Sequence, residues 1–147
     1  MTDPHIDAAP RHGADLTDPH VAASGKVSEA LEWVERARGR LYDFHQLIGH
    51  ADLLLDEAVA ALESCGRTAE ADAVRRELIG RNVVDGHWTF QLVEEFDDLY
   101  YDRFRAVERD IRAALVGGRR LVYEAAMKEQ RRSHGEPGHE RGPQKPA

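Results

Sequence analysis

The sequence contains a single cysteine, Cys65, among its 147 residues. One cysteine permits neither a disulfide framework within the chain nor a zinc site built from cysteine ligands. Such a chain is typical of a reducing compartment, so we expect a cytoplasmic protein. No apolar run approaches the roughly 20 residues that a membrane-spanning helix needs. The opening stretch, MTDPHIDAAPRHGADLTDPH, also lacks the apolar centre of a signal peptide.

Sequence patterns of common catalytic sites are missing as well. There is no Walker A loop, no GxGxxG turn and no serine in a glycine-rich elbow. The helical part of the sequence has no Glu-x-x-His pair of the kind that binds iron in ferritin-like bundles. The formal net charge of −7 makes nucleic acid an unexpected partner, because nucleic-acid binders normally carry a basic surface. These absences favour a protein without enzymatic activity.

The organisation that we predict is one all-α domain between two tails. Residues 1–24 and 133–147 are polar and aperiodic, which predicts disorder, and residues 25–132 are expected to form a bundle of two long and two short helices. The segment TDPH occurs twice, at Thr2–His5 and Thr17–His20. We interpret it as a duplicated part of a tail, and the alternative is a repeated docking motif.

The first helix has the strongest pattern in the sequence. Ser28 is its predicted N-cap and Gly66 its predicted C′ residue, and the repeat keeps its phase past Gly39 and Gly49. We therefore expect one helix of about 37 residues, about 55 Å long. The seven-residue repeat that predicts a coiled-coil-like seam consists of two rows: Val27, Val34, Leu41, Ile48, Leu55 and Leu62, and Ala30, Ala37, Phe44, Ala51, Ala58 and Cys65.

Three further helices follow in the prediction. A short one extends from a cap at Thr68 to a stop at Gly80, and Asp85 is the expected cap of the second long helix. That long helix contains WTFQLVEEFDDLYYDRF and ends or kinks at the glycine pair before Arg119. The last helix is expected within RRLVYEAAMKEQRR.

The acidic stretch in the second long helix reads as a solvated face. At 100° per residue most of its apolar and aromatic side chains gather on one side, whereas Tyr101 points the other way. Its carboxylates surround the apolar side without converging. Arg103 and Asp110 break this pattern, because both fall on the apolar side. We predict that they form structural ion pairs between helices, and the alternative is a polar site inside the bundle.

A short second helix covers only about a third of the first, so a long apolar seam would stay open in one copy. An open seam of this kind predicts a protein–protein interface, either a homodimer or a complex with a helical partner. The aromatic residues expected at this interface are Phe90, Tyr101, Trp33 and Trp88. For the two tryptophans, a place in the core is an equally good interpretation. The leading prediction is thus an interaction or adaptor protein that needs no cofactor.

The alternative prediction is a bundle that binds iron or another divalent metal. His45 and Asp52 lie two turns apart on one flank of the first helix, beside Arg38. Glu95 and Asp102 of the second long helix could complete a His/carboxylate cluster with them. The four candidate metal ligands are therefore His45, Asp52, Glu95 and Asp102.

Overall fold

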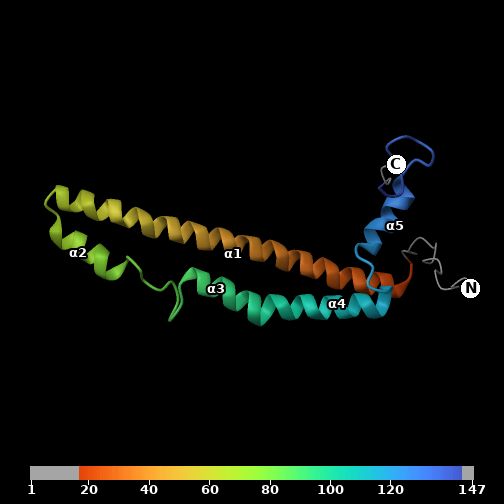
Figure 1. Cartoon of the computed structure of the whole chain (residues 1–147), viewed down its shortest axis with the longest axis horizontal. Coiled ribbons are helices and arrows are strands. Elements are labelled where there is room, and N and C mark those ends of the chain that lie inside the picture. The colour runs from red at the N-terminus through yellow and green to blue at the C-terminus, as the bar shows by residue number, and fades with distance from the viewer. Residues whose placement is uncertain (1–16, 144–147) are drawn as a thin grey trace, which may run out of the picture. The chain divides into compact units, whose positions relative to one another are not determined.

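The computed structural model describes residues 17–143, and their regular structure is helical apart from one isolated bridge between Val84 and His87. The elements, labelled in Figure 1, are α1 (Pro19–Ser64), α2 (Thr68–Glu77), α3 (Thr89–Phe96), the π-helix η1 (Asp97–Tyr101), α4 (Asp102–Val116) and α5 (Val122–Arg131). Because α3, η1 and α4 follow one another without a break, they form the second long helix. The predicted all-α fold of two long and two short helices is confirmed.

Helix α1 is continuous over 46 residues, so the prediction that it passes Gly39 and Gly49 without a break is confirmed. Its C-terminus also follows the prediction, because Gly66 has a φ of 77°. The Arg67 N–H donates to the Leu62 carbonyl at 2.8 Å, and the Gly66 N–H donates to the Glu63 carbonyl at 3.0 Å. These two bonds form a Schellman motif, which requires the left-handed conformation that glycine adopts readily.

The start of α1 differs from the prediction, because the helix begins at Pro19 and Ser28 lies inside it. The Asp18 carbonyl accepts a hydrogen bond from the Ala22 N–H at 3.1 Å, and its Oδ1 accepts one from the His20 N–H at 2.9 Å. Proline suits the next position, where a backbone N–H has no helical acceptor. The second TDPH segment is therefore a helix start, whereas Thr2–His5 lies outside the described residues.

The described chain divides into two compact units, and the first comprises residues 17–30 and 106–143. Its buried apolar residues are Val21, Val116 and Ala126, from α1, α4 and α5. A methyl group on Gly25 would lie 3.9 Å from Cβ of Tyr123, which places α5 against the beginning of α1. Residues 133–143, part of the predicted C-terminal tail, form turns without regular structure, and residues 144–147 are not described.

Hydrogen bonds in this first unit connect α1 with α4. Buried Glu108 accepts one from the Ser28 hydroxyl at 2.9 Å and one from Nε of Arg112 at 3.0 Å. Helix α4 then ends at Val116, and the following Gly117 and Gly118 both have positive φ. The prediction that this glycine pair ends the helix is confirmed.

The second unit comprises residues 31–105, in which α1 pairs with residues 68–105, here called the return segment. Contacts on α1 move toward its N-terminus as the return segment advances, so the two are antiparallel. The side-chain contacts that show this order are Glu63 with Arg75, Asp52 with Gly80, His45 with Thr89, Arg38 with Asp97 and Glu35 with Tyr101.

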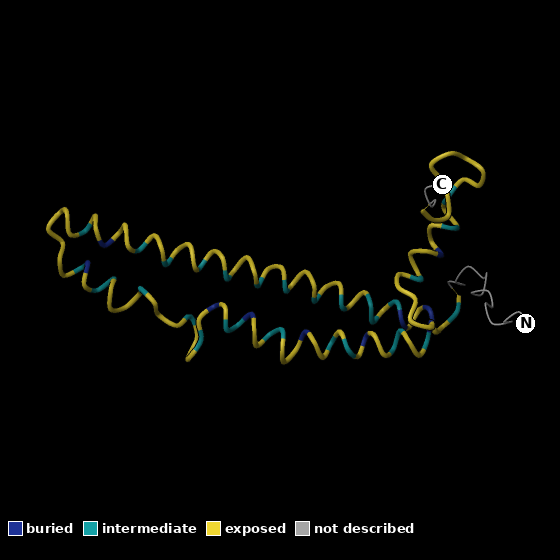
Figure 2. The backbone as a smooth tube through the Cα atoms, in the orientation of Figure 1, coloured by how far each residue is buried: buried dark blue, intermediate teal, exposed yellow. Residues whose placement is uncertain are grey.

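Burial in this second unit is limited, as the colours in Figure 2 show. The positions of α1 with less exposure face α2 and α3, and the opposite side of α1 is exposed. Among the described residues, no large side chain is fully buried. One helix against one return segment makes a single layer, and a single layer leaves one side of its apolar residues in water.

Two predicted helix caps are wrong. Thr68 is the first residue of α2, and Arg67 occupies the N-cap position without a side-chain hydrogen bond. Trp88, rather than Asp85, precedes α3, and its N–H donates to Oε1 of Gln91 at 2.7 Å. Asp85 instead lies in the turn closed by the Val84–His87 bridge. Within residues 17–143, no helix is both long enough and apolar enough to cross a membrane.

Candidate functional site

Two rows of α1 residues face the return segment, and together we call them the inner face. All their members are buried or half-buried: Leu31, Arg38, His45, Asp52 and Val59 in one row, and Val34, Leu41, Ile48, Leu55 and Leu62 in the other. The second row is half of the predicted seam. The other half, from Ala30 through Cys65, is exposed throughout, so the return segment covers one row of the predicted seam and leaves the other row open.

The polar members of the inner face explain this orientation. Arg38 donates two hydrogen bonds to Asp97, from Nε to Oδ1 at 2.7 Å and from Nη2 to Oδ2 at 2.9 Å. Its guanidinium carbon also lies 5.1 Å and 4.7 Å from the ring centres of Tyr42 and Tyr101. The hydrogen bonds lower the pKa of Asp97 and raise the pKa of Arg38. This planar, two-bond geometry holds the two helices in one alignment.

Tyr101 is part of this covered region, although the sequence places it on the exposed side of its helix. Its side chain is only 8% exposed, and its hydroxyl donates to Oε1 of Glu35 at 2.6 Å. The hydrogen bond and the burial both raise the pKa of Tyr101. Its ring stacks on Phe96 with ring centres 6.4 Å apart. The predicted exposed orientation of Tyr101 is therefore wrong, and its role as a contact residue stays a prediction.

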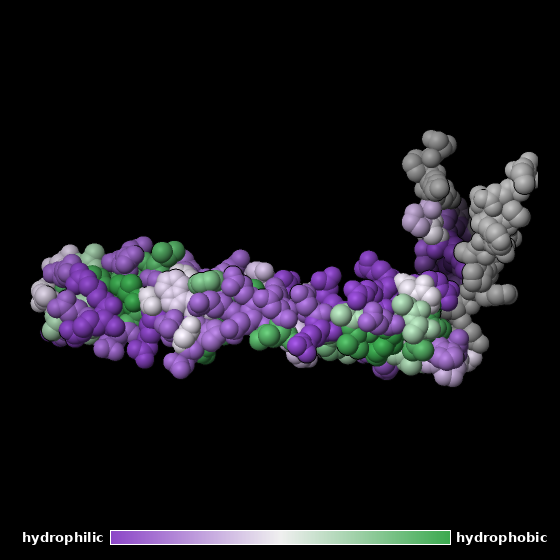
Figure 3. Space-filling model, turned by 60° about the horizontal axis from the view of Figure 1, so that its bottom comes forward, coloured by the Kyte–Doolittle hydropathy of each residue, from purple (hydrophilic) through white to green (hydrophobic). Residues whose placement is uncertain are grey.

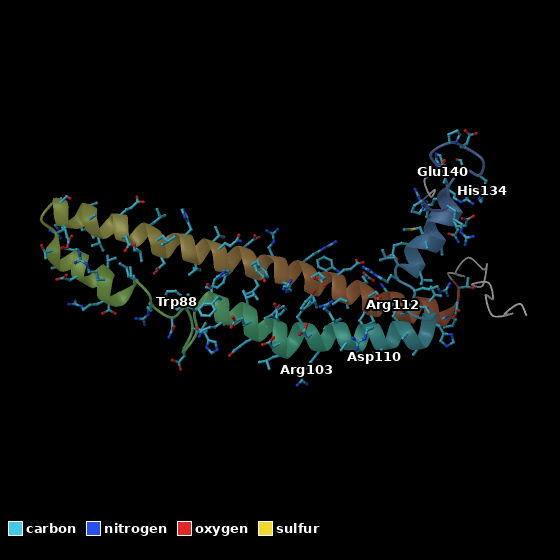
Figure 4. All side chains as sticks on the ribbon, in the orientation of Figure 1. Trp88, Arg103, Asp110, Arg112, His134 and Glu140 are labelled. Carbon is cyan, nitrogen blue, oxygen red and sulfur yellow. The ribbon has the colours of Figure 1, made fainter. Side chains whose placement is uncertain are left out.

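The π-helix Asp97–Tyr101 gives the physical reason. A π turn adds one residue to a helical turn, so every later residue rotates by about 100° relative to a regular α-helix. Arg103 and Asp110, predicted on the apolar side, are both exposed, and Arg103 extends away from α1 in Figure 4. Glu108 takes a buried position instead. The predicted ion pairs of Arg103 and Asp110 across a helix–helix seam are therefore wrong.

The four predicted metal ligands do not come together. His45 Nδ1 lies 2.7 Å from the Thr89 hydroxyl, and Asp52 Oδ1 accepts the Gly80 N–H at 2.9 Å. Glu95 lies 2.9 Å from Nε2 of His87, and exposed Asp102 lies 3.9 Å from Arg105. Among residues 17–143, no three His, Cys, Asp or Glu side chains form a cluster that could hold a metal ion. The predicted His/carboxylate cluster is therefore wrong, because the antiparallel pairing gives each side chain a separate neighbour.

The remaining predicted contact residues are all exposed. Trp88, labelled in Figure 4, donates its indole N–H to the Gly80 carbonyl at 3.0 Å, which fixes the connection between α2 and α3. Phe90 lies in the first turn of α3. Trp33 is 62% exposed, and the Arg36 guanidinium lies 4.6 Å from its ring centre. These three rings remain available for contact with a partner.

A second set of exposed residues runs along α1 beside the inner face, and we call it the outer stripe. Its apolar members are Trp33, Ala37, Phe44, Leu47, Ala51, Leu54, Ala58, Ala61 and Cys65. Their spacing alternates between three and four residues, with Arg40 as the one polar position, and such spacing is that of a coiled-coil seam. Figure 3, which brings the return segment forward, shows hydrophobic and hydrophilic side chains together at the surface on that face of the molecule.

The outer stripe shares only one row, Ala30 through Cys65, with the seam that the sequence predicts. The sequence also contains a seven-residue repeat that marks the other row of the stripe. Five residues repeat every seven positions, three positions after the Ala30–Cys65 row: Trp33, Arg40, Leu47, Leu54 and Ala61.

No family model matches this chain, and neither a curated protein nor a solved structure does. The geometry of the chain itself is therefore the basis for a functional proposal.

Proposed function

We propose that this chain is a non-enzymatic interaction protein that binds another helical surface through the outer stripe of α1. The observation that carries this proposal is the full exposure of a 3–4 spaced apolar seam on a continuous helix. Water-exposed seams of this length are unfavourable in a monomer, and packing against a second helix removes them from water.

The polar groups of the second unit support the same function. Arg38, His45 and Asp52 each contact a different part of the return segment. These contacts fix the alignment of α1 with the return segment, and we call the pair the hairpin. With α1 fixed in this way, its outer stripe is presented as a ridge on one continuous helix. A preorganised ridge loses little conformational entropy when a partner binds.

The proposed setting is a reducing cytoplasm. Cys65 is exposed at the end of the outer stripe, and a reducing environment keeps its thiol from forming disulfides between copies. Trp33 and Phe90 are the proposed aromatic anchors, because exposed aromatic rings contribute strongly to binding once a partner covers them.

Two leucines of α1 provide a matched test. Leu47 belongs to the outer stripe and is 68% exposed, and Leu53 is 67% exposed but lies about a third of a turn away. Leu47→Lys should weaken self-association or partner capture by more than about tenfold, since it places a charge in the buried seam. Leu53→Lys should leave association unchanged.

Light scattering after size-exclusion chromatography measures self-association, and capture from cytoplasmic extract measures binding of other proteins. Circular dichroism should show the same helix content for both variants, because lysine is a good helix former and both sites are exposed. Equal association of the Leu47→Lys and Leu53→Lys proteins would refute the proposal.

A further inference from the structure

We infer that the occupant of the outer stripe is a second copy of the same stripe, packed antiparallel and centred near Gln46. This inference rests on the proposed function and names its partner. It follows from the order of large, small and charged residues along α1, all of which belong to the second unit.

Antiparallel self-pairing brings large side chains opposite small ones. When the two copies meet around this centre, Trp33 of one copy faces Ala58 of the other, and Leu54 faces Ala37. Arg40 faces Ala51, over which its apolar stem can lie while its head stays in water. Phe44 and Leu47 meet in the central layers. Alternation of large and small residues is how a helical seam fills its volume.

The residues that flank the stripe agree with the same alignment. On the solvent side, Arg36 of one copy faces Glu57 of the other, and Asp43 faces His50. Because the axis is two-fold, each of these contacts occurs twice. Within residues 17–143, neither Arg36 nor Glu57 forms a salt bridge; Arg36 lies over the Trp33 ring, and Asp43 pairs with Arg40 of its own helix at 3.1 Å. Opposite charges at flanking positions set the orientation of coiled coils.

The inner flank of the stripe is apolar in this alignment. Leu41 of one copy lies beside Ile48 of the other, and both are only half-buried in the single chain. Pairing would therefore cover the side of these residues that the return segment leaves open. Two hairpins would together form a four-helix arrangement, which supplies the second layer that the single hairpin lacks.

A parallel, in-register pairing is much poorer. It places Trp33 on Trp33, Ala51 on Ala51 and Arg40 on Arg40. One layer is then overcrowded, another contains a void and a third brings two positive charges together.

A charge exchange in the full chain tests the alignment. Arg36→Glu and Glu57→Arg should each weaken dimerisation by about tenfold at low salt, because each replaces two attractions by two repulsions. The double variant should return to within about threefold of the wild type. Along one helix these residues are about 32 Å apart, well beyond the screening length, so rescue requires contact between copies. Sedimentation equilibrium measures the dissociation constant.

Asp56→Arg is the matched control, because Asp56 is exposed next to Glu57 but points away from the stripe. It should change the dimer affinity by less than about twofold. The orientation of the two helices is tested with two Cys65→Ala proteins, one carrying Asp43→Cys and the other His50→Cys. Antiparallel pairing places position 43 of one copy opposite position 50 of the other, so a mixture of the two proteins should form a disulfide between unlike copies.

The outcomes separate this inference from the proposed function. A dimer whose double variant is not rescued, or whose cysteines join only like copies, overturns the antiparallel alignment and leaves binding through the stripe intact. A monomer that captures another protein only when Leu47 is present overturns self-pairing alone. A monomer in which Leu47→Lys changes no binding overturns both.

Discussion

Replacement of Asp97 by asparagine removes the negative charge from the contact that joins α1 to the π-helix. Arg38 then keeps its stacking on Tyr42 and Tyr101 but loses one charge-assisted pair of hydrogen bonds. The side chains of Arg38 and Asp97 are 29% and 25% exposed, so water still screens the pair. We therefore expect a coupling free energy of about 1 kcal/mol, between the values for exposed pairs and for buried charged hydrogen bonds.

A double-mutant cycle measures this coupling. The proteins are the wild type, Arg38→Lys, Asp97→Asn and the combination, unfolded in urea at one protein concentration and followed by circular dichroism at 222 nm. Lysine keeps the charge of Arg38 but cannot form the two-bond contact. A coupling below about 0.3 kcal/mol would refute the assignment of the contact as the one that fixes the alignment.

The same pair predicts a pH dependence. The Arg38 hydrogen bonds lower the folded-state pKa of Asp97 below its ordinary 3.8, so the ionised carboxylate stabilises the fold above that value. This contribution is lost as the pH falls through the folded-state pKa. The stability difference between the wild type and Asp97→Asn should therefore shrink below about pH 4. Parallel stability curves down to about pH 2 would contradict the structural explanation.

Three other predictions concern single side chains. Hydrogen bonds to the Asp85 carbonyl and to Glu95 raise the pKa of His87 above 6.5. The bound proton therefore stabilises the turn around His87 at low pH. This contribution is lost as the pH rises through the raised pKa. NMR titration should show that Glu95→Gln lowers this pKa, and no change would disprove the contact. Tyr101→Phe should cost about 1 kcal/mol in urea unfolding, because the Glu35 carboxylate loses its hydroxyl donor; an unchanged midpoint would count against this bond. Glu108→Ala should cost about 2 kcal/mol, because the partly buried Arg112 guanidinium keeps the Gly118 carbonyl but loses its carboxylate partner, and thermal unfolding with no loss would contradict this.

The sequence predicts the course of α1 well because a long repeat adds many small contributions. Each glycine costs about 1 kcal/mol of helix propensity, and continuous packing of the inner face offsets that cost at Gly39 and Gly49. Gly66 was equally predictable, since a C′ glycine has a specific conformational reason. The start at Pro19 was also readable, because aspartate followed by proline is a good N-cap and first helical residue.

The face that α1 turns toward its own chain was not readable from apolar residues alone. The apolar repeat fits two overlapping seams, and the choice between them depends on partners of Arg38 and Asp52 that lie far along the sequence. The π-helix is a similar case. An extra residue in one turn leaves no local pattern, yet it rotates all of α4 and moves Arg103 and Asp110 into solvent.

The polar row on the inner face has a consequence for folding. A purely aliphatic seam could slide by two turns and still bury similar surface, so several misaligned hairpins would compete with the native one. Here such a slip would bring Asp52 opposite Thr89 instead of the Gly80 N–H and would leave the Asp97 carboxylate facing His45 instead of Arg38. Misaligned hairpins therefore lose their strongest polar bonds all at once, and the chain has one correct alignment to find.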